Sequence, residues 1–228
     1  FAPRDHPALL QALLSAAQRI EALGFDAVFI GDHPSRVPDP WVLLGAIAVA
    51  TERVRLGSGV NCVYYRNPSY LARLAYDLDN LSGGRLMLGL GIGWDEGEFR
   101  ALDKPFPRVP VRQAALEEAL AIINGVWGPD LFSYHGEHFA VENMRVWPPP
   151  VQQPRPPIMI AGGGERRTLR QVAQYADVSN FGAWITVGGA ETPEQVRHKL
   201  AVLRDHCADL GRPYAEIMRS YFTGSVVF

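Results

Sequence analysis

The sequence predicts an α/β fold built on a parallel sheet, either a barrel or a doubly wound open sheet. Short apolar runs of strand length alternate about six times with segments whose apolar residues recur at helical spacing. The runs are continuously apolar, as in strands covered on both faces, and helices of this length suit right-handed βα crossovers. The chain has 228 residues, enough to bury a sizeable core.

Capping and turn residues place the elements of the first half. Apolar residues from Leu13 to Leu23 predict a helix that Gly24 ends. Asp39 and Asn67 each precede a proline, the pattern of an N-cap followed by proline at the first helical position. Gly83 closes the helix that Asn67 begins. The predicted strands of this half are residues 25–30, 54–60 and 85–90.

The second half continues the alternation. A Pro-rich loop over 103–110 leads to a helix through Leu116 and Ile123. Another helix begins at Glu165, and Thr192 with Gln195 forms a capping box for the last one. The predicted strands here are 157–161, 177–181 and 217–227.

One segment breaks this rhythm. Residues 132–139 alternate around a central Gly136 and predict a β-hairpin, inserted at about 130–148. No linker is visible, so residues 1–228 read as a single domain. A complete (β/α)8 barrel takes about 250 residues. Because the chain opens in a helix and closes in a strand, we expect a barrel that is incomplete or lacks segments.

Composition excludes several classes of protein. The net charge is −2, from 22 basic and 24 acidic residues, whereas nucleic-acid and membrane-surface proteins concentrate basic charge. No apolar run is long enough to span a bilayer, and no signal peptide is visible. Cys62 and Cys207 form no CxxC pair, which argues against a disulfide framework or a structural zinc site. We therefore expect a cytoplasmic protein.

Polar and glycine residues follow each predicted strand, where α/β folds place their sites. After the first strand come Asp32 and His33, which could form an oriented acid–base pair because histidine titrates near neutrality. The alternative is a loop histidine bonded to backbone. His135 and His138 are better explained by a solvated hairpin face than by a metal site, so no metal is expected.

Glycines follow two later strands. Gly162, Gly163 and Gly164 join a strand to a helix, and Arg166 and Thr168 add donors there. Glycine permits close approach of a ligand, and a helix start favours anions, so this turn is either a phosphate cradle or a tight βα turn. The earlier glycines at 89, 91 and 93 lack the dinucleotide-binding spacing. They make room for a flat ligand or for crowded side chains.

Segments along almost the whole chain resemble the bacterial luciferase-like superfamily, and within it the oxidoreductases that depend on coenzyme F420. The segments that carry the resemblance are 22–29, Asp32-His33, 55–60, 66–68, 81–86, 89–94, 153–158, 162–164, Thr168-Leu169 and 175–177. Their order and spacing are specific for the superfamily and less so for the branch.

The resemblance implies a TIM barrel with a flavin or deazaflavin ring in its carboxyl-end mouth. It implies a non-proline cis peptide at Gly59-Val60 behind the ring, the cofactor phosphate on the 162–164 turn, and His33 as proton donor or substrate contact beside Asp32. The expected cofactor-binding residues are Gly59, Val60, Asn61, Gly91, Gly93, Gly162, Gly163, Gly164, Arg166 and Thr168. The expected apolar walls of the substrate pocket are Trp41, Tyr64, Tyr65, Trp94 and Phe181.

The sequence departs from the resemblance at one position. Some F420-dependent dehydrogenases carry a glutamate directly after the Gly-x-Gly of the fourth barrel strand, where this chain has Trp94, with Glu96 and Glu98 further on. This argues against a sugar-phosphate dehydrogenase.

The expected function is F420-dependent hydride transfer to or from a small organic substrate. The alternatives are an FMN-dependent monooxygenase fed by a flavin reductase, and a flavin-binding protein without catalysis. A metal-dependent hydrolase has too few acidic and histidine ligands. The resemblance also implies a homodimer that packs early barrel helices together.

Overall fold

The computed structural model describes residues 6–185 and 188–223. Six parallel strands form one sheet in the order β1-β2-β4-β7-β8-β9, and the short β3 also pairs with β4. The strands are β1 (Ala27–Ile30), β2 (Arg55–Ser58), β3 (Asn61–Cys62), β4 (Leu86–Gly91), β7 (Ile158–Ala161), β8 (Val178–Gly182) and β9 (Met218–Phe222).

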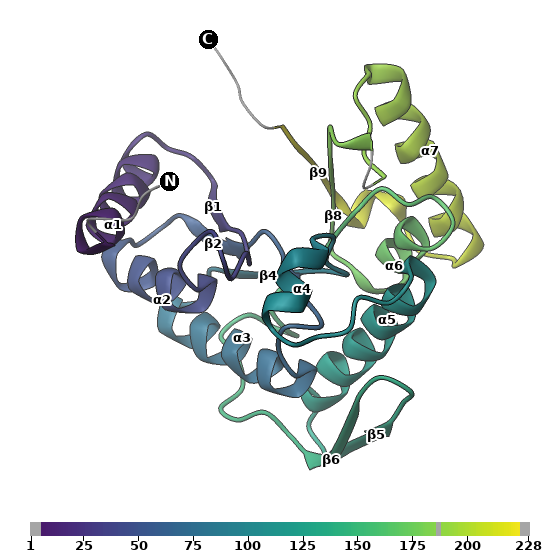
Figure 1. Ribbon diagram of the computed structural model, residues 1–228, viewed down its shortest axis with the longest axis horizontal. Helices are drawn as coiled ribbons and strands as arrows, with labels where there is room; N and C mark the ends of the chain where they lie inside the picture. The colour runs from purple at the N-terminus through teal and green to yellow at the C-terminus, as the bar shows by residue number, and fades with distance from the viewer. Residues whose placement is uncertain (1–5, 186–187, 224–228) are drawn as a thin grey trace.

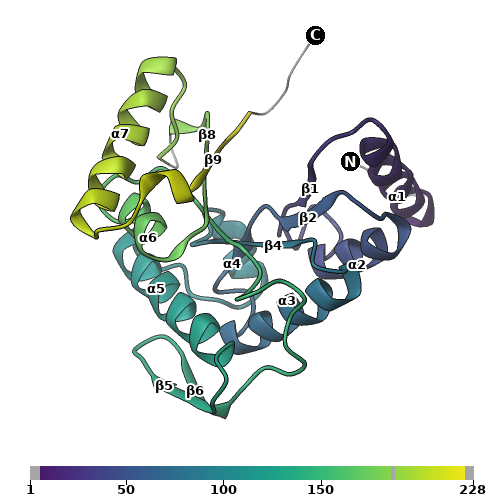
Figure 2. The same ribbon diagram turned by 180° about the vertical axis from the view of Figure 1, so that it is seen from behind.

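The sheet curves into a half-barrel with helices around its convex side (Figure 1). β1 and β9 are the two end strands of the sheet, as the view from behind also shows (Figure 2). The helices are α1 (His6–Ala22), α2 (Pro40–Ala50), α3 (Pro68–Ser82), α4 (Glu96–Ala101), α5 (Val109–Val126), α6 (Thr168–Tyr175) and α7 (Pro193–Asp209), with a 3-10 turn η2 (Tyr214–Glu216). The expected parallel α/β architecture is confirmed, but the barrel is not closed within the described residues.

Local signals begin or end three of the helices as predicted. The Asp39 side chain accepts from the N–H groups of Trp41 and Val42, and Asn67 accepts from Ser69. Gly83 takes a left-handed conformation (φ 68°) after α3, which favours glycine. Thr192 and Gln195 form the predicted capping box.

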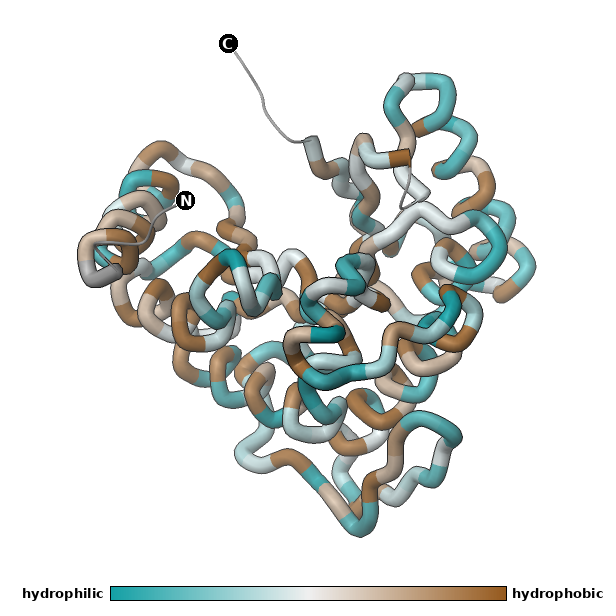
Figure 3. Tube along the Cα trace, viewed as in Figure 1, coloured by the Kyte–Doolittle hydropathy of each residue, from teal (hydrophilic) through white to brown (hydrophobic). Residues whose placement is uncertain are grey.

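Alternation along the strands divides the apolar residues between two faces. On β4, Leu86, Leu88 and Leu90 are buried in the core between sheet and helices. Met87 faces the concave side, where it packs in a small cluster with Met159, Val178 and Val60. Apolar segments run through the sheet and its flanking helices (Figure 3).

Several details differ from the predictions. A loop was expected after the third predicted strand (85–90), but α4 forms there, and α6 begins at Thr168 rather than Glu165. The last strand begins at Met218, one residue later than predicted, and residues 224–227 of that prediction lie outside the described residues.

β5 (Phe132–His135) and β6 (Ala140–Met144) pair antiparallel beside α5.

The described residues contain no helix long and apolar enough to cross a membrane. They contain no cluster of three or more His, Cys, Asp or Glu side chains arranged to hold a metal ion. Cys62 and Cys207 are both buried free thiols, and burial raises the pKa of Cys62 to about 12.

Candidate functional site

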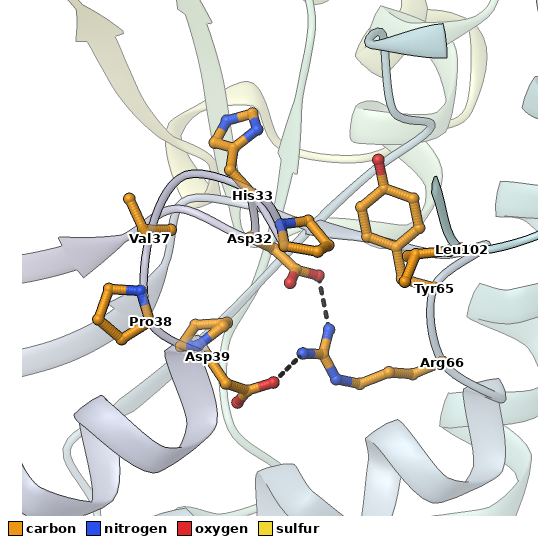
Figure 4. Close-up of a pocket in the computed structure, with 10 residues that line it drawn as sticks. Asp32, His33, Val37, Pro38, Asp39, Tyr65, Arg66 and Leu102 are labelled. Atoms are coloured by element: carbon orange, nitrogen blue, oxygen red, sulfur yellow. Dashed lines mark hydrogen bonds and ion pairs between the residues drawn. The ribbon is translucent and has the colours of Figure 1, made fainter. Parts of the chain in front are cut away.

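The carboxyl ends of β1, β3 and β4 bring three loops together at one edge of the sheet, and α4 lies over that edge (Figure 1). A cavity of about 260 Å³ opens between the loop after β1 and the loop after β3. Its lining residues are Asp32, His33, Pro34, Val37, Pro38, Asp39, Pro40, Tyr65, Arg66 and Leu102 (Figure 4).

Asp32 does not orient His33, contrary to the expected acid–base pair. The two side chains leave the backbone on opposite sides, as neighbouring residues do along extended chain (Figure 4). The Asp32 carboxylate instead accepts a hydrogen bond from Arg66 Nη1 at 2.6 Å. Both residues line the cavity, but they act in separate clusters.

The Asp32 cluster is an ion-pair network that ties three segments together. Arg66 also bonds Asp39, the N-cap of α2, through Nη2. Asp32 is only 5% exposed, and burial raises its pKa although the Arg66 charge opposes that rise. Because Arg66 lies between two carboxylates, it holds the loops after β1 and β3 against the start of α2.

The His33 cluster contains a buried glutamate that the sequence analysis did not assign. His33 Nδ1 lies 3.1 Å from both carboxylate oxygens of Glu98. The Glu98 side chain is 3% exposed and that of His33 is 31% exposed. Tyr65 donates its hydroxyl proton to Glu98 at 3.2 Å. Burial and the nearby Glu98 raise the pKa of Tyr65, so its hydroxyl stays protonated.

Trp94 lies beside His33 at the exposed side of this cluster. The two rings meet edge to face with centroids 5.9 Å apart, and Trp94 is 54% exposed. The Arg36 guanidinium lies over the Trp94 ring at 5.5 Å and pairs with Asp95, the N-cap of α4. His33 therefore faces an exposed aromatic surface.

The other expected pocket walls lie elsewhere. Trp41 is buried and donates its indole N–H to Asn61 at 3.0 Å. Tyr64 packs between Phe99 and Phe139 on the helix side of the sheet, with its hydroxyl unpaired by any described group. Phe181 is 3% exposed on β8. Of the expected walls, only Trp94 and Tyr65 lie beside His33.

Three of the expected cofactor contacts serve packing. Asn61 is fully buried, and its amide donates to Gly89 O and to Ser58 Oγ. A Cβ on Gly91 would lie 2.8 Å from Val60, and one on Gly93 would meet Phe99 and Cys62 within 2.7 Å. Crowded side chains thus surround these glycines, and room for a flat ligand stays a prediction.

The cis peptide bond that the resemblance implied is present between Gly59 and Val60. The Val60 side chain packs against Met87 and Met159 on the concave face of the sheet. An apolar surface thus lies at the carboxyl end of β2, where the resemblance places a flat ring.

The glycine turn after β7 has the chemistry of an anion site. Gly162 N–H donates to Asn180, whereas the N–H groups of Gly163 and Gly164 bond no described acceptor. A Cβ on Gly163 would lie 2.2 Å from a backbone oxygen of Gly188, so only glycine fits. Lys199 Nζ bonds Gly163 O at 2.7 Å and also pairs with the Glu165 carboxylate at 3.2 Å. The turn therefore fits a phosphate group.

Of the two donors expected near this turn, Thr168 is bonded inside the protein and Arg166 is exposed. The Thr168 hydroxyl accepts from Gln113 Nε2 at 2.9 Å inside the protein. Arg166 is exposed at the turn, free to reach a ligand in solvent. Lys199 had not been singled out from the sequence because it lies on α7, far along the chain.

Comparisons with known proteins show the family to which the chain belongs. The sequence model of luciferase-like monooxygenases matches residues 2–227. The chain belongs to this family. An uncharacterised protein of Mycobacterium tuberculosis is 33% identical over 189 residues, 82% of this chain and 62% of that one.

A second luciferase-like relative has a named activity. The F420-dependent glucose-6-phosphate dehydrogenase of Amycolatopsis mediterranei is 31% identical over 196 residues, 82% of this chain and 55% of that protein. Among solved structures, a monooxygenase of Streptomyces bottropensis superposes with a TM-score of 0.82 at 25% identity, covering 96% of this chain and 66% of that one. The chain thus spans 55–62% of the length of the curated relatives it matches.

Proposed function

We propose that this protein is an F420-dependent oxidoreductase that transfers a hydride to or from a small, apolar organic substrate at the mouth of the half-barrel. The observation that carries the proposal is His33, part-exposed at the carboxyl edge of the sheet with a buried carboxylate on one ring nitrogen. The F420 dependence of the 31%-identical relative supports this choice of cofactor.

The cofactor would be held at two places. The N–H groups of Gly163 and Gly164, with Arg166, would bind its phosphate, and the apolar face at Val60 would carry its ring. F420 supplies hydride transfer at C5 of its deazaflavin ring. The protein's own groups position the two reactants and limit the access of water.

His33 would move the proton that accompanies the hydride. A proton leaves the substrate oxygen when an alcohol is oxidised and returns when a carbonyl is reduced, and Nε2 bonds no described group. Trp94 beside His33 offers an aromatic rather than an anionic surface, which supports an apolar substrate over a sugar phosphate.

Fluorescence titration of the purified chain with F420 and with FMN tests the cofactor. Tight binding of F420 and weak binding of FMN is the expected result. Weak binding of F420, or preference for FMN, would contradict the proposal.

The role of His33 is tested in single-turnover hydride transfer. We expect His33→Ala to slow the step by about 10²- to 10⁴-fold, the usual contribution of a positioned proton-transfer group. His135→Ala, on an exposed hairpin histidine, should leave the rate unchanged. An unchanged rate in His33→Ala would remove the shuttle role.

A second candidate is an FMN-dependent monooxygenase supplied with reduced flavin by a partner reductase. The likeness to the Streptomyces bottropensis monooxygenase favours it. Oxygen consumption with supplied reduced FMN would distinguish it from the F420 enzyme. Tight cofactor binding without turnover under any reductant would instead identify a flavin-binding protein without catalysis.

A further inference from the structure

Glu98 is a buried carboxylate at the centre of the His33 cluster. It lies in the first turn of α4, and its side chain is 3% exposed. A buried carboxylate is costly unless hydrogen bonds satisfy it. Here the partners are the His33 ring, the Tyr65 hydroxyl and, at 3.7 Å, Arg36 Nε.

The geometry leaves the two nitrogens of the His33 ring in different surroundings. Nδ1 lies 3.1 Å from each Glu98 oxygen, whereas Nε2 has no hydrogen bond to any described residue. An ionised carboxylate only accepts hydrogen bonds, so this contact requires a proton on Nδ1. In the neutral ring, Nε2 then carries the free lone pair.

We propose that Glu98 is a positioning residue that holds His33 as its Nδ1–H tautomer and leaves Nε2 free to exchange a proton with the substrate. The inference deepens the proposed function and rests on it, because it takes His33 as the group that moves the proton. Since its side chain is 3% exposed, Glu98 would act through the imidazole rather than by contact with substrate or cofactor.

The rest of the cluster holds the carboxylate in place. Asp95 caps α4 by accepting from the N–H groups of Gly97 and Glu98, which sets the helix that carries Glu98. Tyr65 donates to Oε2. Arg36 has its closer contact with Asp95, so the main partner of the Glu98 charge is the histidine rather than the arginine.

Glu96 provides a matched control on the same helix. Glu96 and Glu98 both lie in the first turn of α4, where a negative charge has the same effect on the helix dipole. The side chain of Glu96 is 60% exposed and contacts Arg100. Glu96→Gln therefore removes one carboxylate from α4 without touching His33.

The first measurement is the tautomer of His33 in the protein without cofactor. Long-range ¹H–¹⁵N spectra distinguish Nδ1–H from Nε2–H, and the signals missing in His33→Ala assign the ring. At about pH 9, above the ordinary titration range of imidazole, we expect Nδ1–H alone in the wild type and in Glu96→Gln. Glu98→Gln should give a mixture, because an amide can accept or donate.

The second measurement is single-turnover hydride transfer. We expect Glu98→Gln to slow the step by about tenfold to a hundredfold, part of what a positioned proton-transfer group contributes. Cofactor affinity should be unchanged, since Glu98 does not reach the glycine turn. Glu96→Gln should match the wild type in both properties.

A proton on Nε2 in the wild type would overturn the inference, and this result needs no variant to fold. Wild-type tautomer signals retained in folded Glu98→Gln would overturn it as well. If the tautomer changes as expected but no cofactor binds, the proposed function fails while the positioning of His33 by Glu98 stands. A changed tautomer with an unchanged transfer rate would overturn the link to catalysis.

Discussion

Asn61 shows how much a single buried side chain can connect. Its amide oxygen accepts from the Trp41 indole of α2, and its amide nitrogen donates to Gly89 O on β4. Ser58 at the end of β2 completes the group, since its hydroxyl lies 2.5 Å from Asn61 Nδ2 and donates to Gly89 O. Because its amide oxygen and amide nitrogen are both bonded inside the protein, Asn61 connects α2 to the strands rather than reaching a ligand.

We predict that Asn61→Ala destabilises the cofactor-free protein by about 2–3 kcal/mol, because it leaves buried donors and acceptors unpaired. Denaturant unfolding would measure the loss. Asn124→Ala is the control, since the Asn124 side chain bonds no described group other than Leu120 O of its own helix, and it should cost much less. Equal stability of the two variants would contradict a structural role for Asn61.

At the scale of the elements, the Glu21 side chain connects α1 to the loop before β2. It lies near the end of α1, and its carboxylate accepts from the backbone N–H groups of Glu52, Arg53 and Val54 in the loop that leads to β2. These hydrogen bonds, that of Val54 first, lower the pKa of Glu21 to about 2. Glu21 thereby attaches α1 to the loop before β2.

The lowered pKa predicts a window of pH dependence. Because the folded value lies below the ordinary 4.5, the stabilisation is complete above pH 4.5 and is lost as the pH falls towards 2. We expect Glu21→Gln to lower the melting temperature by a constant amount from pH 7 to pH 5, and the difference to shrink below that. Thermal unfolding monitored by circular dichroism at several pH values measures it.

The matched variant for this experiment is Glu191→Gln, whose exposed carboxylate bonds no described side chain or backbone group. Its difference from the wild type should be small at every pH. A Glu21→Gln difference that persists unchanged at pH 2 would show that the carboxylate charge is not what stabilises the loop.

At the scale of the whole molecule, α2 has more apolar surface than one half-barrel covers. Its eleven residues carry no charge, and its outer face exposes Val42 at 71% and Val49 at 72%. These valines are seven residues apart, so they lie on the same side of the helix. Figure 3 shows few hydrophilic positions along this helix.

The expected homodimer stays a prediction, and α2 is the place to test it. A second copy packed on this face would cover both valines. Light scattering should give a mass near that of two chains, and Val49→Glu should shift it towards one. Leu131→Glu, at a residue 67% exposed before β5, should leave the mass unchanged. A wild-type mass of one chain would contradict the prediction.

The site was less predictable than the fold. The helices that begin after Asp39 and Asn67 were predictable from the sequence, because each of these residues bonds N–H groups only two or three residues away. The six residues of α4 include Gly97, and their one buried apolar side chain is Phe99, so no periodicity indicates the helix. Glu98 and its contact with His33, 65 positions away, were missed with it.

The sequence by itself determined the order of the main strands and helices, several helix caps and the membership in the luciferase-like family, because these depend on neighbours along the chain. Only the tertiary structure decided which charges pair. In the structure Arg66 pairs with Asp32, and Glu98 contacts His33. The curvature of the sheet and the position of α4 over its edge bring together residues that no local sequence pattern connects.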